Sequence, residues 1–64
     1  MRTLKEYYEI FGPTGTIVFN LQNRGFSCEN KNEGEILAGM YDILGMARNK
    51  KSKAIAAAIA LQNH

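Results

Sequence analysis

The sequence predicts an α+β fold, a small single domain in which a helix, a β-hairpin and two C-terminal helices follow one another. Three observations lead to this prediction. Apolar residues recur at helical spacing near the N-terminus, alternate with a period of two in the middle of the chain, and return to helical spacing from residue 32 onward. A chain of 64 residues can bury only one hydrophobic core, so we expect one domain over residues 1–64.

The first predicted helix covers residues 3–11. Thr3 and Glu6 have the spacing of a capping box, in which a hydroxyl and a carboxylate each bind a free backbone amide at a helix start. Gly12 and Pro13 end the helix, because glycine adopts the left-handed C-terminal conformation and proline cannot continue the hydrogen bonding. One face of this helix is apolar and consists of Leu4, Tyr7, Tyr8 and Phe11.

A β-hairpin is predicted in the middle of the chain. Residues 16–21 are rich in β-branched and aromatic side chains, which favour a strand. A polar turn follows at residues 22–25, after which Phe26 and Cys28 resume the alternation. A single hairpin is marginally stable in water, so we expect it to pack against the helices. Its buried face in the first strand would be formed by Ile17, Phe19 and Leu21.

Two helices are predicted in the C-terminal part. Asn32 and Glu35 form a second cap pair, and a polar turn at residues 49–52 precedes a last helix capped by Ser52. The alternative is one helix over residues 33–62, which keeps the apolar phase but would be about 45 Å long and would imply an oligomer. We favour the break. The apolar face of the first of these helices consists of Ile36, Leu37, Met40, Ile43, Leu44 and Ala47.

The predicted core draws on all of these elements. Tyr7 and Tyr8 are adjacent and point about 100° apart on a helix, so only one of them can face the core. We assign Tyr8 to the core and Tyr7 to the surface as an interface contact. We expect Ile43→Ala to cost about 2–5 kcal/mol. The full expected core is Leu4, Tyr8, Phe11, Ile17, Phe19, Leu21, Phe26, Ile36, Met40, Ile43, Leu44, Ile55 and Ile59.

The inventory of reactive side chains argues against an enzyme. Cys28 is the one cysteine and His64 the one histidine, so the chain has no internal disulfide and no four-ligand zinc set. The glycine-rich segment 12–16 lacks the lysine of a phosphate-binding loop. Two pairs of acidic residues, Glu6 with Glu9 and Glu33 with Glu35, are interpreted as parts of solvated helix faces. We therefore expect no catalytic residues, no cofactor and no metal.

Charge is segregated along the chain. Residues 43–64 contain four cations and no acid, whereas residues 1–42 carry a net negative charge. Two interpretations remain open: the cations form a solvated turn that offsets the dipole of the preceding helix, or they bind phosphates. We call these four residues the basic collar; they are Arg48, Lys50, Lys51 and Lys53.

The last helix has no polar side. Ala56, Ala57 and Ala60 lie opposite Ile55 and Ile59, and a helix that is apolar all round is normally buried. A chain of 64 residues can hardly surround such a helix, so either the alanines are exposed or a partner covers them. Because this helix offers almost no side chain that could read base edges, sequence-specific DNA binding is disfavoured.

These observations favour a small non-enzymatic protein-interaction module, an accessory regulator or inhibitor. It would bind another protein, or a second copy of itself, through the apolar C-terminal helix and the basic collar, with Tyr7 as a further contact. The alternative is a nucleic-acid-binding protein that uses the basic collar against phosphates. Charged residues interrupt the N-terminal segment and the longest apolar run, residues 54–61, is too short for a membrane span, so we expect a cytoplasmic protein with no membrane partner.

Overall fold

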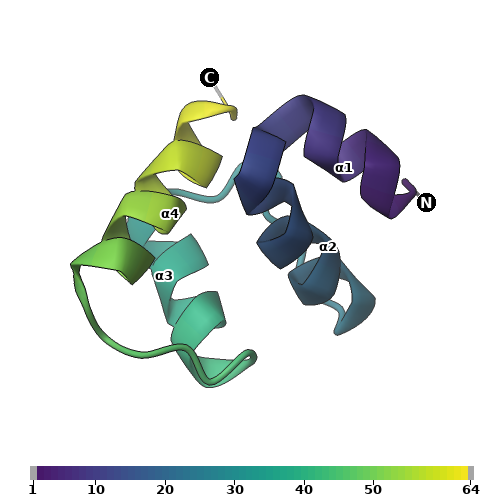
Figure 1. Ribbon diagram of the computed structural model, residues 1–64. Helices are drawn as coiled ribbons and strands as arrows, with labels where there is room; N and C mark the ends of the chain where they lie inside the picture. The colour runs from purple at the N-terminus through teal and green to yellow at the C-terminus, as the bar shows by residue number, and fades with distance from the viewer. Residues whose placement is uncertain (1, 64) are drawn as a thin grey trace.

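Residues 2–63 form an all-helical fold in the computed structural model, which describes this part of the chain. No strand occurs among these residues. The helices make two hairpins, α1 with α2 and α3 with α4, which lie side by side (Figure 1). The elements in order are α1 (Leu4–Phe11), the 3-10 turn η1 (Gly12–Thr14), α2 (Gly15–Asn23), α3 (Glu33–Asp42) and α4 (Lys50–Leu61).

The predicted β-hairpin is wrong, and with it the α+β fold class. Residues 15–23 are helical, and residues 26–29 lie in the connection to α3 without forming a strand. The buried positions of α2 are Gly15, Val18 and Leu21, a spacing of three that a strand cannot place on one face. β-branched residues disfavour a helix only slightly, so helix packing outweighs their preference for a strand.

Gly15 explains why α2 packs so closely against α1. A side chain at this position would overlap with the carbonyl group of Tyr7, so the close approach of the two helices requires glycine. The side of α1 that faces α2 carries Tyr7, which is 7% exposed, whereas Tyr8 is 53% exposed. The Tyr7 ring stacks on Phe11 and meets Phe19 edge-on, with ring centroids 6.4 Å and 5.9 Å apart. The assignment of Tyr8 to the core and Tyr7 to the surface is therefore reversed.

The C-terminal part consists of two helices, so the alternative of one continuous helix is wrong. The break lies earlier than predicted, at residues 43–49. Asn49, not Ser52, caps α4 by accepting a hydrogen bond from the Ser52 amide at 2.9 Å. Ser52 is instead buried, and its hydroxyl donates to the Ala47 carbonyl at 2.6 Å, which holds the loop against the helix.

The two predicted capping boxes at the helix starts are both present. In α1 the Glu6 amide donates to the Thr3 hydroxyl and the Thr3 amide donates to the Glu6 carboxylate. The start of α3 repeats this arrangement with Asn32 and Glu35. These caps satisfy backbone amides that have no partner inside the helix. They are local interactions, and this is why they could be read from the sequence.

The hydrophobic core lies between the two hairpins. Leu4, Tyr8 and Ile43 were expected there but are exposed; Ile43 follows the end of α3, where the helical phase that predicted its burial no longer applies. Phe11, Ile17, Phe19, Phe26, Leu44 and Ile55 are partly buried against the core. The buried apolar residues are Tyr7, Val18, Leu21, Cys28, Ile36, Met40, Ala56, Ile59 and Ala60.

The end of α4 is tied to the connection between the hairpins. The Asn63 side-chain amide donates to the Cys28 carbonyl at 2.7 Å and to the Lys31 carbonyl at 3.1 Å. Because these bonds join residues far apart in sequence, they hold one face of α4 against the core and turn the other outward. Among residues 2–63, no helix combines the length and the apolar character needed to cross a membrane.

Candidate interaction surface

The inner face of α4 belongs to the core of this chain. Ser52, Ala56, Ile59 and Ala60 are buried against the rest of the molecule. Two of the alanines predicted to contact a partner, Ala56 and Ala60, are on this face and are 0% and 8% exposed. These two alanines offer no surface to another molecule. Tyr7, which was also predicted to contact a partner, is buried as well.

The opposite face of α4 is exposed and apolar. Its residues follow the spacing i, i+3, i+4 and i+7, so they form one continuous stripe along the helix. Leu61 at its end is 69% exposed, the most open large apolar side chain among residues 2–63. Ala57 is the one predicted alanine contact that lies here. We call this stripe the outer face of α4; it consists of Ala54, Ala57, Ala58 and Leu61.

Sequence reasoning missed Ala54, Ala58 and Leu61 as surface residues. Alanine and isoleucine occur all round this helix, so its sequence contains no polar stripe that would mark the solvent side. The polar residues of α4 before Gln62 are confined to its start, and one of them, Ser52, is buried on the inner face. The orientation of α4 was therefore decided by its contacts with α3 and η1.

All four residues of the basic collar are exposed at the start of α4. The one ion pair among residues 2–63 joins Arg2 to Glu29, with 3.8 Å between nitrogen and oxygen, so no collar cation has an acidic partner in this part of the chain. Arg48 packs over the ring of Tyr41 with its guanidinium carbon 4.2 Å from the ring centroid. The collar therefore presents positive charge that the fold leaves uncompensated.

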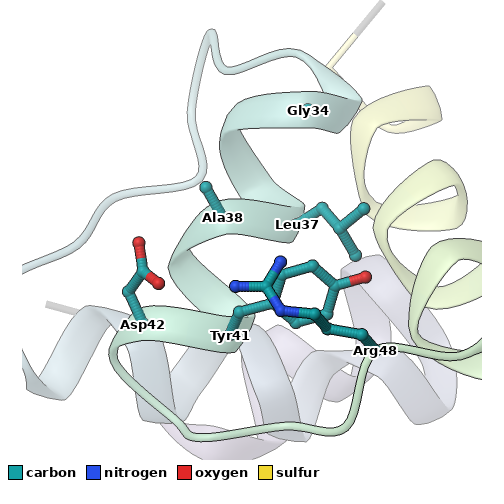
Figure 2. Close-up of a pocket in the computed structure, with 6 residues that line it drawn as sticks. All are labelled: Gly34, Leu37, Ala38, Tyr41, Asp42 and Arg48. Carbon is teal, nitrogen blue, oxygen red and sulfur yellow. The ribbon is translucent and has the colours of Figure 1, made fainter.

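A shallow groove runs along α3 beside the collar (Figure 2). Its volume is about 240 Å³, which is below the range of about 300–1,000 Å³ typical of small-molecule sites. At Gly34 and Ala38 the side chains are small, which leaves room above the α3 backbone. A groove of this size suits one or two side chains of a peptide better than a cofactor. It is lined by Gly34, Leu37, Ala38, Tyr41, Asp42 and Arg48.

Reactive groups in the described part of the chain are few. Within residues 2–63, no three side chains among histidine, cysteine, aspartate and glutamate come close enough to hold a metal ion. Burial raises the pKa of the Cys28 thiol to about 11, against a smaller lowering by Lys31. The thiol is therefore protonated at neutral pH, which makes it a poor nucleophile.

Comparison of the chain with protein-family models, with curated protein sequences and with solved structures gives no match.

Proposed function

We propose that this protein is a non-enzymatic interaction module that binds another protein through the outer face of α4 and the basic collar. It would act as an accessory regulator or inhibitor. The observation that carries the proposal is the apolar, exposed stripe that ends at Leu61, on the side of α4 facing away from the core. Full burial of a leucine side chain contributes about 1.5–3 kcal/mol, so a partner that covers this stripe gains binding free energy.

The small side chains of the stripe favour a helical partner. Ala54, Ala57 and Ala58 project little from the helix, so a second helix can approach closely along it. A standard interface buries about 800 Å² on each side, roughly a fifth of the 4163 Å² surface of this molecule. One leucine and three alanines offer less than that, so the interface must extend beyond the stripe, and the adjoining collar supplies charge for orienting the partner.

Site-specific photo-crosslinking tests this proposal. A photoreactive phenylalanine analogue replaces Ala57 on the outer face of α4, and in a control protein it replaces Asn23, an exposed residue at the end of α2. In cells that make the protein, we expect a discrete protein adduct from position 57 and none from position 23. Equal labelling at both positions, or none at position 57, would contradict the proposal.

A second copy of the chain is the first partner to test. If the outer faces of two copies pack together, Ala57→Glu introduces a desolvated charge into the interface and separates them. We expect sedimentation equilibrium to give a dimer for the wild type and for Asn23→Glu at the end of α2, and a monomer for Ala57→Glu. A monomeric wild type at high concentration would assign the surface to a different protein.

Nucleic-acid binding is the second candidate function, supported by the unpaired charge of the basic collar. The affinity for duplex DNA should then fall with salt, at a slope of about −0.9 per phosphate contacted, and the slope should not exceed about 4 for one copy. Replacement of Lys50, Lys51 and Lys53 by glutamate should abolish a gel shift. A gel shift that survives these substitutions would exclude the collar as the site.

A cytoplasmic location is part of the proposal. It is supported by Cys28, which is a free and buried thiol. Proteins of oxidising compartments usually pair their cysteines in disulfides, whereas a free thiol is typical of a reducing compartment.

A further inference from the structure

Arg48 is held in place by a contact that leaves its hydrogen-bond donors free. The guanidinium carbon lies 4.2 Å from the centroid of the Tyr41 ring, a cation–π contact that is not a hydrogen bond. No hydrogen bond or ion pair joins the Arg48 side chain to another residue in the described part of the chain. A guanidinium offers a fork of N–H donors that matches a carboxylate, so Arg48 is oriented and unoccupied as a receptor for one.

The groove beside Arg48 has room for the rest of a ligand. Gly34 and Ala38 lie one helical turn apart and leave the α3 backbone nearly uncovered, while Leu37 provides an apolar wall. Figure 2 shows the guanidinium end of Arg48 lying over Tyr41, with Ala38 and Asp42 on the far side of the groove. Space for a small apolar group therefore lies next to a place for a carboxylate.

The charges around the groove favour an acidic ligand. Lys50 and Lys51 follow Arg48 directly, and residues 43–64 contain no acid. Asp42 is the one acidic residue that lines the groove, and it makes no ion pair with Arg48. Its charge opposes a second anion on that side, so a ligand with a single carboxylate at Arg48 fits better than a phosphate-rich polymer.

From this arrangement we infer that the groove on α3 binds an acidic, apolar peptide segment of the partner. The side-chain carboxylate of a glutamate or aspartate pairs with Arg48, and a small apolar side chain of the same segment packs on Ala38 and Leu37. The inference rests on the proposed function, and it specifies the chemistry of the partner. It also supplies the additional contact area that the outer face of α4 lacks.

Nuclear magnetic resonance titration provides the direct test. The probe is a short end-blocked peptide of alanine, leucine and glutamate, with a matched peptide in which glutamine replaces glutamate. We expect saturable shifts of the Arg48 side-chain N–H and the Tyr41 ring with the glutamate peptide, and about tenfold weaker binding of the glutamine peptide. Equal binding of the two peptides would overturn the inference.

Four variants sharpen the test. Arg48→Ala should abolish binding, and Arg48→Lys should weaken it, because lysine keeps the charge but loses the fork of donors. Ala38→Glu should also abolish binding, since the new carboxylate would occupy Arg48 from within the chain. Asp42→Asn should strengthen binding a few-fold, because it removes a competing charge.

Arg24→Ala is the matched control, since it removes an exposed arginine from the end of α2, outside the groove. Its affinity for the glutamate peptide should equal that of the wild type. Circular dichroism identifies any variant that fails to fold. If Arg48→Ala fails to fold, the deciding measurement is the affinity of Asp42→Asn for the glutamate peptide, compared with that of the wild type. Unchanged affinity of both a folded Arg48→Ala and Asp42→Asn would show that Arg48 only fastens the loop, which overturns the inference.

The outcomes separate this inference from the proposed function. Loss of the position-57 adduct together with retained glutamate-selective peptide binding would contradict the α4 surface and keep the groove. An adduct at position 57 that is formed equally well by Arg48→Ala, with no peptide selectivity, would support the α4 surface and overturn the groove. Stronger binding of duplex DNA than of the glutamate peptide, lost in Arg48→Ala, would overturn the groove as a peptide site.

Discussion

The hairpin of α1 and α2 is closed by backbone contact, whereas the hairpin of α3 and α4 is closed by side chains. In the first, the three residues of η1 connect the helices and Gly15 packs directly against the Tyr7 carbonyl. In the second, residues 43–49 form a longer loop, which the Ser52 hydroxyl and the Arg48 side chain fasten to the helices. A hollow also lies at the first hairpin, but the Arg2–Glu29 ion pair joins two of the residues that line it. The second hairpin has the groove beside the unpaired Arg48 and the exposed outer face of α4. The candidate interaction surfaces accordingly lie on the second hairpin.

The largest expected effect tests whether the two hairpins share one core. Met40 on α3 is fully buried, whereas Ile43 just beyond this helix is 37% exposed. Met40→Ala should lower the free energy of unfolding by about 2–5 kcal/mol, and Ile43→Ala by much less. Chemical denaturation followed by circular dichroism measures both. Two separate unfolding transitions, of which Met40→Ala shifts only one, would show that the hairpins fold independently.

A substitution at Gly15 tests the close backbone contact between α1 and α2. Gly15→Ala places a methyl group against the Tyr7 carbonyl, so the helices must separate, and we expect a loss of about 1–3 kcal/mol in the free energy of unfolding. The control is Gly34→Ala, because a methyl group there meets only the Asn32 side chain, at 3.4 Å. The control should leave stability unchanged or raise it by up to about 1 kcal/mol. Equal effects in thermal unfolding would disprove the close packing.

Ser52 provides the corresponding test in the second hairpin. Ser52→Ala removes the hydrogen bond to the Ala47 carbonyl and should cost about 0.5–1.5 kcal/mol. The effect is smaller than at Gly15 because α3 and α4 keep their apolar contacts. Amide hydrogen exchange should rise in residues 43–49 and remain unchanged in α1. A rise that is uniform along the chain would mean that this hydrogen bond does not fasten the loop specifically.

The effect expected of Cys28, in the connection between the hairpins, is confined to alkaline pH. Burial raises its pKa from an ordinary value of 9.0 to about 11, so the folded protein binds this proton more tightly than the unfolded chain does. The stabilisation that comes from keeping this thiol protonated is therefore complete below pH 9.0 and is lost as pH rises towards about 11. Denaturation midpoints across this range should fall more steeply for the wild type than for Cys28→Ala. Parallel curves would show that Cys28 is not the group responsible.

Some features of this protein were determined by the sequence alone. The capping boxes at Thr3 and Asn32 could be read because each satisfies its own helix start within a few residues. The need for a break before α4 was equally readable, although the break lies at residues 43–49. The clustering of cations at the start of α4 also follows from the sequence, although only the structure shows that no acid of the described residues pairs with them.

Only the tertiary structure decided the conformation of residues 15–23 and the buried faces of α1 and α4. The β-branched run in α2 has only a weak local preference, which the contact between Gly15 and Tyr7 overrides. The local sequence does not distinguish Tyr7 from Tyr8. Tyr7 is buried because α2 packs on its side of α1. In the same way, α4 is apolar all round, so the contacts with α3 and η1 select Ala56 and Ala60 for the core and leave Ala57 and Leu61 exposed. Burial depends on which surfaces meet in space, and a helix without a polar stripe does not encode that choice locally.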